Sequence, residues 1–361
     1  MNRIRLLKTI DRTIGRSFVS LLSAIERKQN KVSDKLSKIL IIRPGGIGDA
    51  VLLIPAINFL RQKFPEATID ILCEKRNADI FSLSRDVHKA YLYDKGLDLF
   101  RCLSNKYDVV IDTEQWHRLS AVLTSLTKAP VRIGFDTNER HKLFTHRVSY
   151  SQDDYEVVSF FRLLEPLGAN PEPGCGNPPF INIRGEGFSP PSALTREDRL
   201  VAIFPGASVR ERKWGGDQFG VVAKALSDIG YHVVLLGSSA DKADAELIKK
   251  KAPSVTDLAG KTDLRQVATV LGMSSLLISA DSGLLHVAYA VGIPTVSLFG
   301  SGIEKKWAPR GRKHIVINKH LDCSPCTRFG YTPKCKRNVE CLASIHVDEV
   351  IEAARTILDA P

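Results

Sequence analysis

The chain has 361 residues, well above the ~100–200 residues of a common domain, so we expect two domains. Hydrophobic residues make up 43% and charged residues 25%, which excludes intrinsic disorder and fibrous repeats. The formal net charge is +11, and an excess of this kind suggests an anionic partner.

The positive charge is concentrated near the amino terminus. Residues 1–38 hold ten Lys and Arg against three Asp and Glu, so this segment carries +7 and the rest of the chain only +4. Nucleic acid is a poor fit, because the excess is not spread over a binding face. No run approaches the ~18 apolar residues that span a bilayer, and the first residues lack the apolar core and cleavage site of a secretory signal. We therefore expect a cytoplasmic protein.

Residues 3–27 are predicted to form a helix with an apolar and a basic side. Apolar residues recur at every third or fourth position, which is the helical period. The apolar side holds Ile4, Leu7, Ile10, Ile14, Phe18, Leu21, Leu22 and Ile25, and the basic side holds Arg3, Arg5, Lys8, Arg12 and Arg16. Such a helix could lie on an anionic membrane, or pack its apolar side on its own protein or on a partner subunit. We treat 1–37 as an amino-terminal extension.

Short apolar runs then alternate with helical stretches over 38–170. The predicted strands are Ile39–Ile42, Thr68–Cys73, Ala90–Tyr93, Val109–Asp112 and Val131–Gly134, and the predicted helices are 49–64, 96–105, 116–127 and 155–167. Strands that alternate with helices in this way form a parallel sheet covered on both faces. We expect 38–170 to be one α/β domain.

Residues 171–198 are rich in Pro and Gly and are predicted to link two domains, with room for a short strand at Phe180–Ile183. The alternation restarts over 199–361. Here the predicted strands are Leu200–Phe204, His232–Leu236, Leu276–Ser279, Thr295–Phe299 and Ile315–Ile317, and the predicted helices are 217–229, 240–250, 263–271, 283–291 and 346–358. A segment at 320–343 with four cysteines and many basic residues interrupts the pattern.

Three glycines follow the first strand, Gly45, Gly46 and Gly48, and Asp49 stands at the start of the next helix. Glycines allow a tight turn and a close approach to a ligand, and open α/β sheets bind ligands at the carboxyl ends of their strands. One interpretation is a dinucleotide fingerprint with Glu74 as the ribose acid, but position 51 is Val where a third glycine is needed. Another is that Asp49 only caps the helix.

Two strand ends of the second half carry groups suited to an anion. The first is followed by Pro205-Gly206-Ala207-Ser208 and then by Arg210, Arg212 and Lys213. The second runs into Asp281-Ser282-Gly283, where a helix bearing His286 starts, and the N–H groups at a helix start bind anions. The structural alternatives are a solvated basic loop and a helix that Asp281 or Ser282 merely caps, with His286 in the core.

Several motifs occur in an order that resembles a known family. They are Gly48-Asp49, Pro205-Gly206-Ala207 with Lys213-Trp214, LAGKTDL at 258–264, DSGLLH at 281–286 and PTVSLFG at 294–300. Over 39–358 the chain resembles the ADP-heptose:lipopolysaccharide heptosyltransferases, glycosyltransferase family nine. The resemblance implies an α/β type-B glycosyltransferase fold, in which two Rossmann-like domains face each other across a cleft. The carboxyl-terminal half would bind the nucleotide-sugar and the amino-terminal half the acceptor.

The resemblance also implies a function. It is an inverting, metal-independent transfer of heptose from ADP-heptose to a lipid-linked saccharide of the lipopolysaccharide core, with no cofactor required. The chain contains no Asp-x-Asp dyad of the kind that holds a cation in metal-dependent sugar transferases. The protein would be cytoplasmic and peripherally attached to the inner membrane, with residues 3–27 as the tether. The alternatives that stay open are an NAD-type oxidoreductase and a nucleotide-binding Rossmann protein without transferase activity.

The motif match assigns roles to individual residues. Asp49 would be the general base for the acceptor hydroxyl. Donor diphosphate and sugar contacts would come from Ser208, Lys213, Asp281, Ser282, Gly283, Leu284 and His286. Asp241, with Asp244 as the second choice, lies just past the strand that ends at Gly237 and could accept hydrogen bonds from the nucleotide ribose.

Four cysteines form the pattern C-x2-C-x8-C-x5-C, namely Cys323, Cys326, Cys335 and Cys341. The first pair has zinc-knuckle spacing, so the set could hold a structural zinc. An iron–sulfur centre, disulfides and simple reduced thiols stay open.

Overall fold

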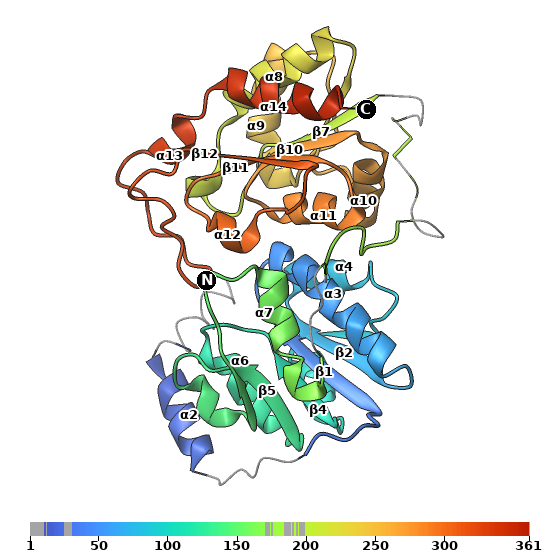
Figure 1. Ribbon diagram of the computed structural model, residues 1–361, viewed down its shortest axis with the longest axis vertical. Coiled ribbons are helices and arrows are strands. Elements are labelled where there is room, and N and C mark those ends of the chain that lie inside the picture. The colour runs from blue at the N-terminus through green and yellow to red at the C-terminus, as the bar shows by residue number, and fades with distance from the viewer. Residues whose placement is uncertain are drawn as a thin grey trace. The chain divides into compact units, whose positions relative to one another are not determined.

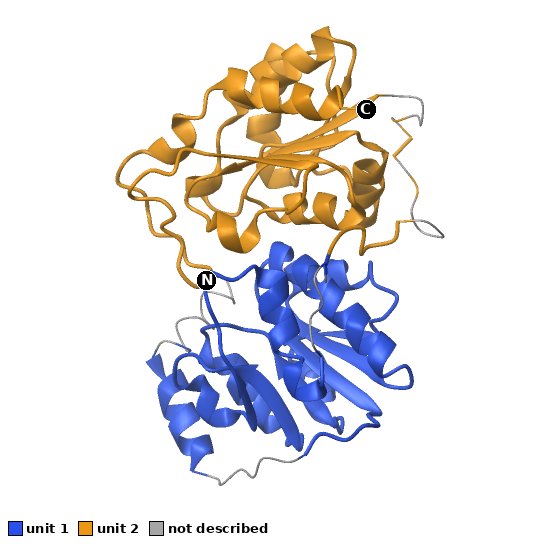
Figure 2. Cartoon of the chain, viewed as in Figure 1, with its two compact units in different colours: residues 1–176 blue, residues 177–361 orange. Residues whose placement is uncertain are grey.

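The computed structural model describes residues 11, 13–24, 31–169, 174, 176–183, 189, 191–192, 194 and 199–360. The chain divides into unit 1, residues 1–176, and unit 2, residues 177–361 (Figure 2). Much of the predicted linker 171–198 lies outside the described residues, as do residues 3–10 and 25–27 of the predicted amino-terminal helix. Each unit contains one six-stranded sheet with helices packed on it (Figure 1).

Unit 1 contains a sheet of parallel strands that are mostly buried, because helices cover both faces. The strands are β1 (Lys38–Arg43), β2 (Thr68–Cys73), β3 (Lys89–Leu92), β4 (Val109–Asp112), β5 (Val131–Phe135) and β6 (His146–Val148). The helices are α2 (Gly15–Ser23), α3 (Ile47–Lys63), α4 (Lys75–Phe81), α5 (Gly96–Leu103), α6 (Arg118–Leu126) and α7 (Glu156–Arg162), with short 3₁₀ turns at η1 (Glu139–Leu143) and η2 (Glu165–Leu167).

Unit 2 repeats this architecture. Its strands are β7 (Leu200–Phe204), β8 (His232–Leu235), β9 (Thr256–Asp257), β10 (Leu276–Ala280), β11 (Thr295–Phe299) and β12 (His314–Asn318). Its helices are α8 (Gly216–Asp228), α9 (Lys242–Lys251), α10 (Leu264–Met273), α11 (Gly283–Val291), α12 (Glu304–Trp307), α13 (Glu340–Ala343) and α14 (Val347–Leu358), with 3₁₀ turns at η3 (Arg210–Arg212) and η4 (Ser239–Asp241). The predicted α/β fold class is confirmed by these two sheets.

The strand orders place a binding crevice in each unit. Unit 1 has the order β3-β2-β1-β4-β5-β6, and unit 2 has the corresponding order β12-β11-β10-β7-β8-β9. In each sheet the order reverses between the first and fourth strands, β1 beside β4 and β7 beside β10. Chains that leave neighbouring parallel strands in opposite directions open a crevice at their carboxyl ends, and ligands bind there.

Helix α2 packs on unit 1 through Val19 and Leu22, and only Leu22 belongs to the apolar side that the sequence pattern indicated. Val19 is fully buried and contacts apolar residues of α6 and η1, whereas Ile14, Phe18 and Leu21 are 45%, 40% and 72% exposed. The buried carboxylate of Asp11 accepts a hydrogen bond from the Leu119 N–H of α6 at 2.7 Å, which anchors the segment. Of the described members of the predicted apolar side, Leu22 packs on unit 1 and the other three are exposed.

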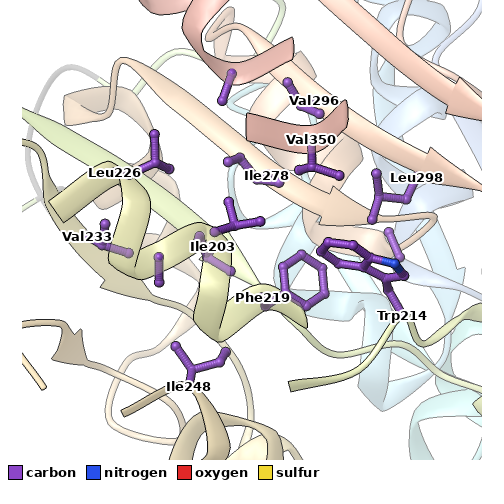
Figure 3. Close-up of a cluster of buried hydrophobic side chains, with 14 of the residues drawn as sticks. Ile203, Trp214, Phe219, Leu226, Val233, Ile248, Ile278, Val296, Leu298 and Val350 are labelled. Carbon is purple, nitrogen blue, oxygen red and sulfur yellow. The ribbon is translucent and has the colours of Figure 1, made fainter. Parts of the chain in front are cut away.

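The core of unit 2 lies between its sheet and α8, α9 and α14 (Figure 3). Trp214 is buried there, with its ring edge-on to Phe219 at 4.9 Å and its indole N–H donating to the Ile345 carbonyl at 3.2 Å. Because the neighbouring residue is Lys213, this anchor fixes the place from which that lysine extends.

Several predicted elements differ from the observed ones. The strand predicted at Phe180–Ile183 is wrong. The N–H groups of Phe180 and Ile181 do not join a sheet but donate to the Ala290 carbonyl near the end of α11. The sequence pattern also missed α4, β6 and β9. These elements are seven residues or shorter, too short for a clear period to emerge.

Candidate functional site

Asp49 lies at the switch point of unit 1. Helix α3 begins at Ile47 with Gly46 as its N-cap residue, and no side chain caps it. The interpretation of Asp49 as a simple cap is therefore wrong. Its carboxylate is 24% exposed and faces the buried guanidinium of Arg43, with Oδ2 and Nη2 at 3.5 Å. The structure thus sets one partly exposed carboxylate at the carboxyl edge of the sheet.

The glycine loop of unit 1 is occupied by protein side chains. The Gly45 N–H donates to Glu74 Oε1 at 3.0 Å, and the Tyr93 hydroxyl donates to the same oxygen at 2.6 Å. A diphosphate needs such N–H groups for itself and is repelled by a carboxylate. Glu74 is the residue that a dinucleotide would need for its ribose, so its position here argues against the dinucleotide interpretation.

A network of buried charges lies on the other side of this crevice, after β4. Asp112 and Arg140 are both fully buried and form an ion pair at 2.6 Å, and the Arg140 side chain also donates to the Glu114 carbonyl. Burial acts to raise the pKa of Glu114, but neighbouring cations, His117 and Arg43 first, lower it below its ordinary value. Glu114 is therefore a carboxylate at neutral pH. The loop that follows β4 is held in place by Asp112 of β4 and by Arg140 of η1.

The switch point of unit 2 lies between the loops after β7 and β10. Ser282 caps α11, since its hydroxyl accepts from the Leu285 N–H at 3.3 Å. The capping interpretation of Ser282 is thus correct, but the cap engages only one of the first N–H groups of the helix. Those of Gly283 and Leu284 have no partner within a helix at this position. His286 is buried on the same helix, as the structural alternative expected.

Asp281 is tied to the loop after β7 through Arg212. The carboxylate is buried and pairs with the Arg212 guanidinium at 3.1 Å, and that guanidinium lies over the Trp307 ring at 5.6 Å. A Cβ at Gly302 would lie 2.0 Å from Asp281 Oδ2, so only glycine allows this loop to approach so closely. The loops after three neighbouring strands therefore meet at Asp281.

Lys213, Asp241 and Asp244 form a second cluster on the same edge. The Lys213 ammonium is 2.9 Å from Asp244 and 3.9 Å from Asp241. Asp241 is buried, and its carboxylate accepts from the Ser238 N–H and hydroxyl at 2.9 Å and 2.8 Å. Asp241 thus holds its own loop, and Asp244 is the more accessible carboxylate for a polar ligand. Ser208 lies exposed in the loop between β7 and η3.

Two residues of these sites were not singled out as site residues by the sequence. Arg43 and Glu114 are named by no motif, yet Arg43 lies 3.5 Å from Asp49, and the Asp49 and Glu114 carboxylates both act on the Arg43 guanidinium. Arg43 carried a signal, because a charged residue that ends an otherwise apolar buried strand needs a partner. Glu114 gave none, since its role depends on the pairing of β1 with β4.

The four cysteines lie in unit 2 after β12. Cys323 is exposed and Cys341 is buried, and all four are free thiols. Burial raises the pKa of Cys326 and of Cys341, which favours the thiol over the thiolate. Within the described part of the chain, no three His, Cys, Asp or Glu side chains are grouped so as to hold a metal ion. The structural zinc stays a prediction.

A hollow of about 800 Å³ in unit 1 is lined by residues that include Lys63, His146 and Gly168. His146 begins β6 and Lys63 ends α3, so the hollow lies at the amino ends of the parallel strands. The switch point is at their carboxyl ends. The hollow is therefore no part of the site around Asp49.

Comparison with known proteins identifies the family. A sequence model of glycosyltransferase family 9 (heptosyltransferase) matches residues 97–336. Lipopolysaccharide heptosyltransferase 3 of Escherichia coli is 30% identical over 343 residues, which covers 87% of this chain and 96% of that protein. The chain belongs to glycosyltransferase family 9. It is a glycosyltransferase, so the oxidoreductase and the non-catalytic alternatives are wrong.

Solved structures of the family have the same fold. The structure of Escherichia coli ADP-heptose lipopolysaccharide heptosyltransferase II superposes with a TM-score of 0.71 at 23% identity, covering 89% of this chain and 98% of that one. The Escherichia coli heptosyltransferase WaaC, solved with ADP-2-deoxy-2-fluoro heptose, gives 0.69 at 18% identity, covering 89% and 99%. At these identities the likeness concerns the fold alone.

Removing one member of the buried Asp112–Arg140 pair should destabilise unit 1. Arg140→Met leaves the carboxylate of Asp112 unpaired in the interior, and we expect a loss of about 3–5 kcal/mol in the free energy of unfolding. Urea denaturation measures this loss, and the double variant Arg140→Met/Asp112→Asn should recover most of it. Equal stabilities of the single and double variants would contradict the pairing.

Proposed function

We propose that this glycosyltransferase moves heptose from ADP-heptose to the lipopolysaccharide core or a related glycolipid, with inversion at the anomeric carbon. One observation carries the proposal. The helix start at the switch point of unit 1 carries the partly exposed carboxylate of Asp49, whereas the helix start at the switch point of unit 2 lies on the same sheet edge as Lys213, which is 30% exposed and pairs with Asp244. The first suits the removal of a proton from an acceptor hydroxyl, and the second suits a diphosphate.

The donor assignment is supported by the chemistry of unit 2. The N–H groups at the start of α11 attract negative charge, and Lys213 adds a cation 30% exposed at the same edge of the sheet. The relatives named above are heptosyltransferases, and one was solved with an ADP-linked heptose analogue. A donor of the same class fits a site with these groups.

The proposed mechanism assigns a separate role to the side chains of each unit. Asp49 accepts the proton of the acceptor hydroxyl as its oxygen attacks the anomeric carbon. The bond between that carbon and the diphosphate oxygen breaks, and ADP leaves with the electron pair. Lys213, Ser208 and the N–H groups of Gly283 and Leu284 stabilise the charge that grows on the diphosphate. The scheme uses no metal or organic cofactor.

A donor panel tests the proposal. The purified protein is incubated with a core acceptor and, in turn, ADP-heptose, ADP-glucose and UDP-glucose, and transfer is read by mass spectrometry. We expect transfer from ADP-heptose only.

Asp49→Asn should lower kcat about 100–10,000-fold with unchanged donor affinity, because the base is lost and the fold is kept. Asp98→Asn, in the first turn of α5 of the same unit, is the control and should leave kcat unchanged. Transfer from UDP-glucose alone, or full activity of Asp49→Asn, would contradict the proposal.

Lys213→Ala should affect binding as well as turnover. Loss of a charge-assisted hydrogen bond to the diphosphate is worth about 1.5–3 kcal/mol, so donor Kd should rise about tenfold or more and kcat should fall with it. Calorimetry with ADP and steady-state kinetics measure the two effects. Lys224→Ala removes a lysine that pairs with Asp228 on the surface of α8, and should change neither. An unchanged Kd for Lys213→Ala would remove this lysine from the donor site.

We also propose that α2 is part of a contact with an anionic membrane at the cytoplasmic face. Ile14, Phe18 and Leu21 recur at helical spacing on its exposed face, while its other face packs on unit 1. None of the described helices has the length and apolar character that spanning a bilayer requires. Contact through exposed apolar side chains next to a basic segment suits an enzyme whose acceptor is lipid-linked.

Vesicle binding tests the membrane contact. The triple variant Ile14→Gln/Phe18→Gln/Leu21→Gln should bind phosphatidylglycerol-containing vesicles at least tenfold more weakly in a flotation assay, because about 1 kcal/mol of apolar burial is lost per side chain. The control, Leu97→Gln/Phe100→Gln, removes two side chains on α5 that are 62% and 68% exposed. Equal binding by the triple variant and the wild type would contradict the contact, as would an equal loss in the control.

A further inference from the structure

Arg43 is a fully enclosed cation directly behind the candidate base. It is the last residue of β1, its side chain is 2% exposed, and its three guanidinium nitrogens face three different acceptors. Nε donates to the Pro44 carbonyl at 2.7 Å and Nη1 donates to the Thr113 carbonyl at 2.9 Å. Nη2 faces Asp49 Oδ2 at 3.5 Å. Two of the three guanidinium nitrogens are thus bonded to backbone carbonyls, and the third faces Asp49.

The guanidinium is also held from a third element of unit 1. The Phe160 ring of α7 lies 5.7 Å from its central carbon. Burial acts to lower the pKa of Arg43, but the carboxylates around it, Asp49 first and then Glu114, hold that pKa above its ordinary value. Arg43 is therefore charged at neutral pH, and its guanidinium is held by contacts from several segments of unit 1.

Gly45 leaves the space that this arrangement needs. Its φ of +108° lies in a region that favours glycine, and a Cβ at this position would lie 3.0 Å from Arg43 Nη2. A side chain here would press on the nitrogen that faces Asp49. Gly45 therefore leaves room for the Arg43–Asp49 pair.

We propose that Arg43 is a positioning residue for the transfer reaction. It engages Oδ2 of Asp49 and so turns the other oxygen, Oδ1, toward the acceptor hydroxyl whose proton Asp49 takes. This inference rests on the proposed role of Asp49 as the base. A lysine could not replace the arginine, because a single ammonium does not reach the Thr113 carbonyl and Asp49 in the same fixed geometry.

The test is a double-mutant cycle in the full-length protein. The variants are Arg43→Met, Arg43→Lys, Asp49→Asn and the combination Arg43→Met/Asp49→Asn. We measure kcat at saturating donor and acceptor, the Kd for ADP by calorimetry and the melting temperature. Displacement of a reacting group by about 1 Å can cost 100-fold in rate, so we expect Arg43→Met to lower kcat about 100-fold with ADP affinity within twofold.

The decisive comparison is made in the Asp49→Asn background. If Arg43 acts through Asp49, adding Arg43→Met there lowers the residual rate no further. A residue that only supports the fold would lower it by the same factor in both backgrounds, and that result would overturn the proposal. Single-turnover assays with radiolabelled donor give the sensitivity that the residual rates require.

Arg43→Lys keeps the test open where Arg43→Met does not fold, because it retains the buried charge. We expect a loss of at least tenfold in kcat at a melting temperature close to that of the wild type. Full activity of Arg43→Lys would overturn the proposal, because the three contacts of the guanidinium group would then not be needed. Wild-type kcat in Asp49→Asn would instead overturn the assignment of the base, which separates the two failures.

Discussion

Parallel strands end together, and this constraint determines where the chemistry of the protein can lie. In each sheet the chain leaves two neighbouring strands in opposite directions, β1 and β4 in unit 1 and β7 and β10 in unit 2. Backbone at that point is not covered by a crossing helix, so polar side chains and ligands can be accommodated there. Every residue assigned to acceptor or donor lies on one of these two edges.

The two edges differ in the groups that they can offer to a ligand, although the folds are alike. In unit 1 the N–H of the glycine loop is used by Glu74, and a buried arginine stands behind Asp49. This leaves a carboxylate to interact with a ligand. In unit 2 the carboxylate of Asp281 is neutralised by Arg212, and the start of α11 and the partly exposed Lys213, which pairs with Asp244, are the groups that can attract an anion. The same topology can therefore serve proton removal in one unit and diphosphate binding in the other.

The fold could be predicted from the sequence because buried parallel strands are continuous apolar runs. Thr68–Cys73, Leu200–Phe204 and Thr295–Phe299 were found with their observed bounds. Short elements such as β9 could not be found, and the strand predicted at Phe180–Ile183 was wrong because its N–H groups bond to α11 instead. The sequence identified the residues that follow strands, but not their pairing. Arg43 with Asp49, and Arg212 with Asp281, depend on which loops the strand order brings together.

The net charge of +11 also takes on a more definite meaning. Most of it lies in the first 38 residues, and we propose that it serves the membrane contact and not the reaction. The central claim concerns that reaction, a direct displacement with Asp49 as the single base. The anomeric configuration of the transferred sugar, determined by NMR on the product formed from ADP-heptose, tests it most directly. Inversion relative to the donor is the predicted result, and retention would contradict the account, because it would require two successive displacements or attack from the face that the diphosphate leaves.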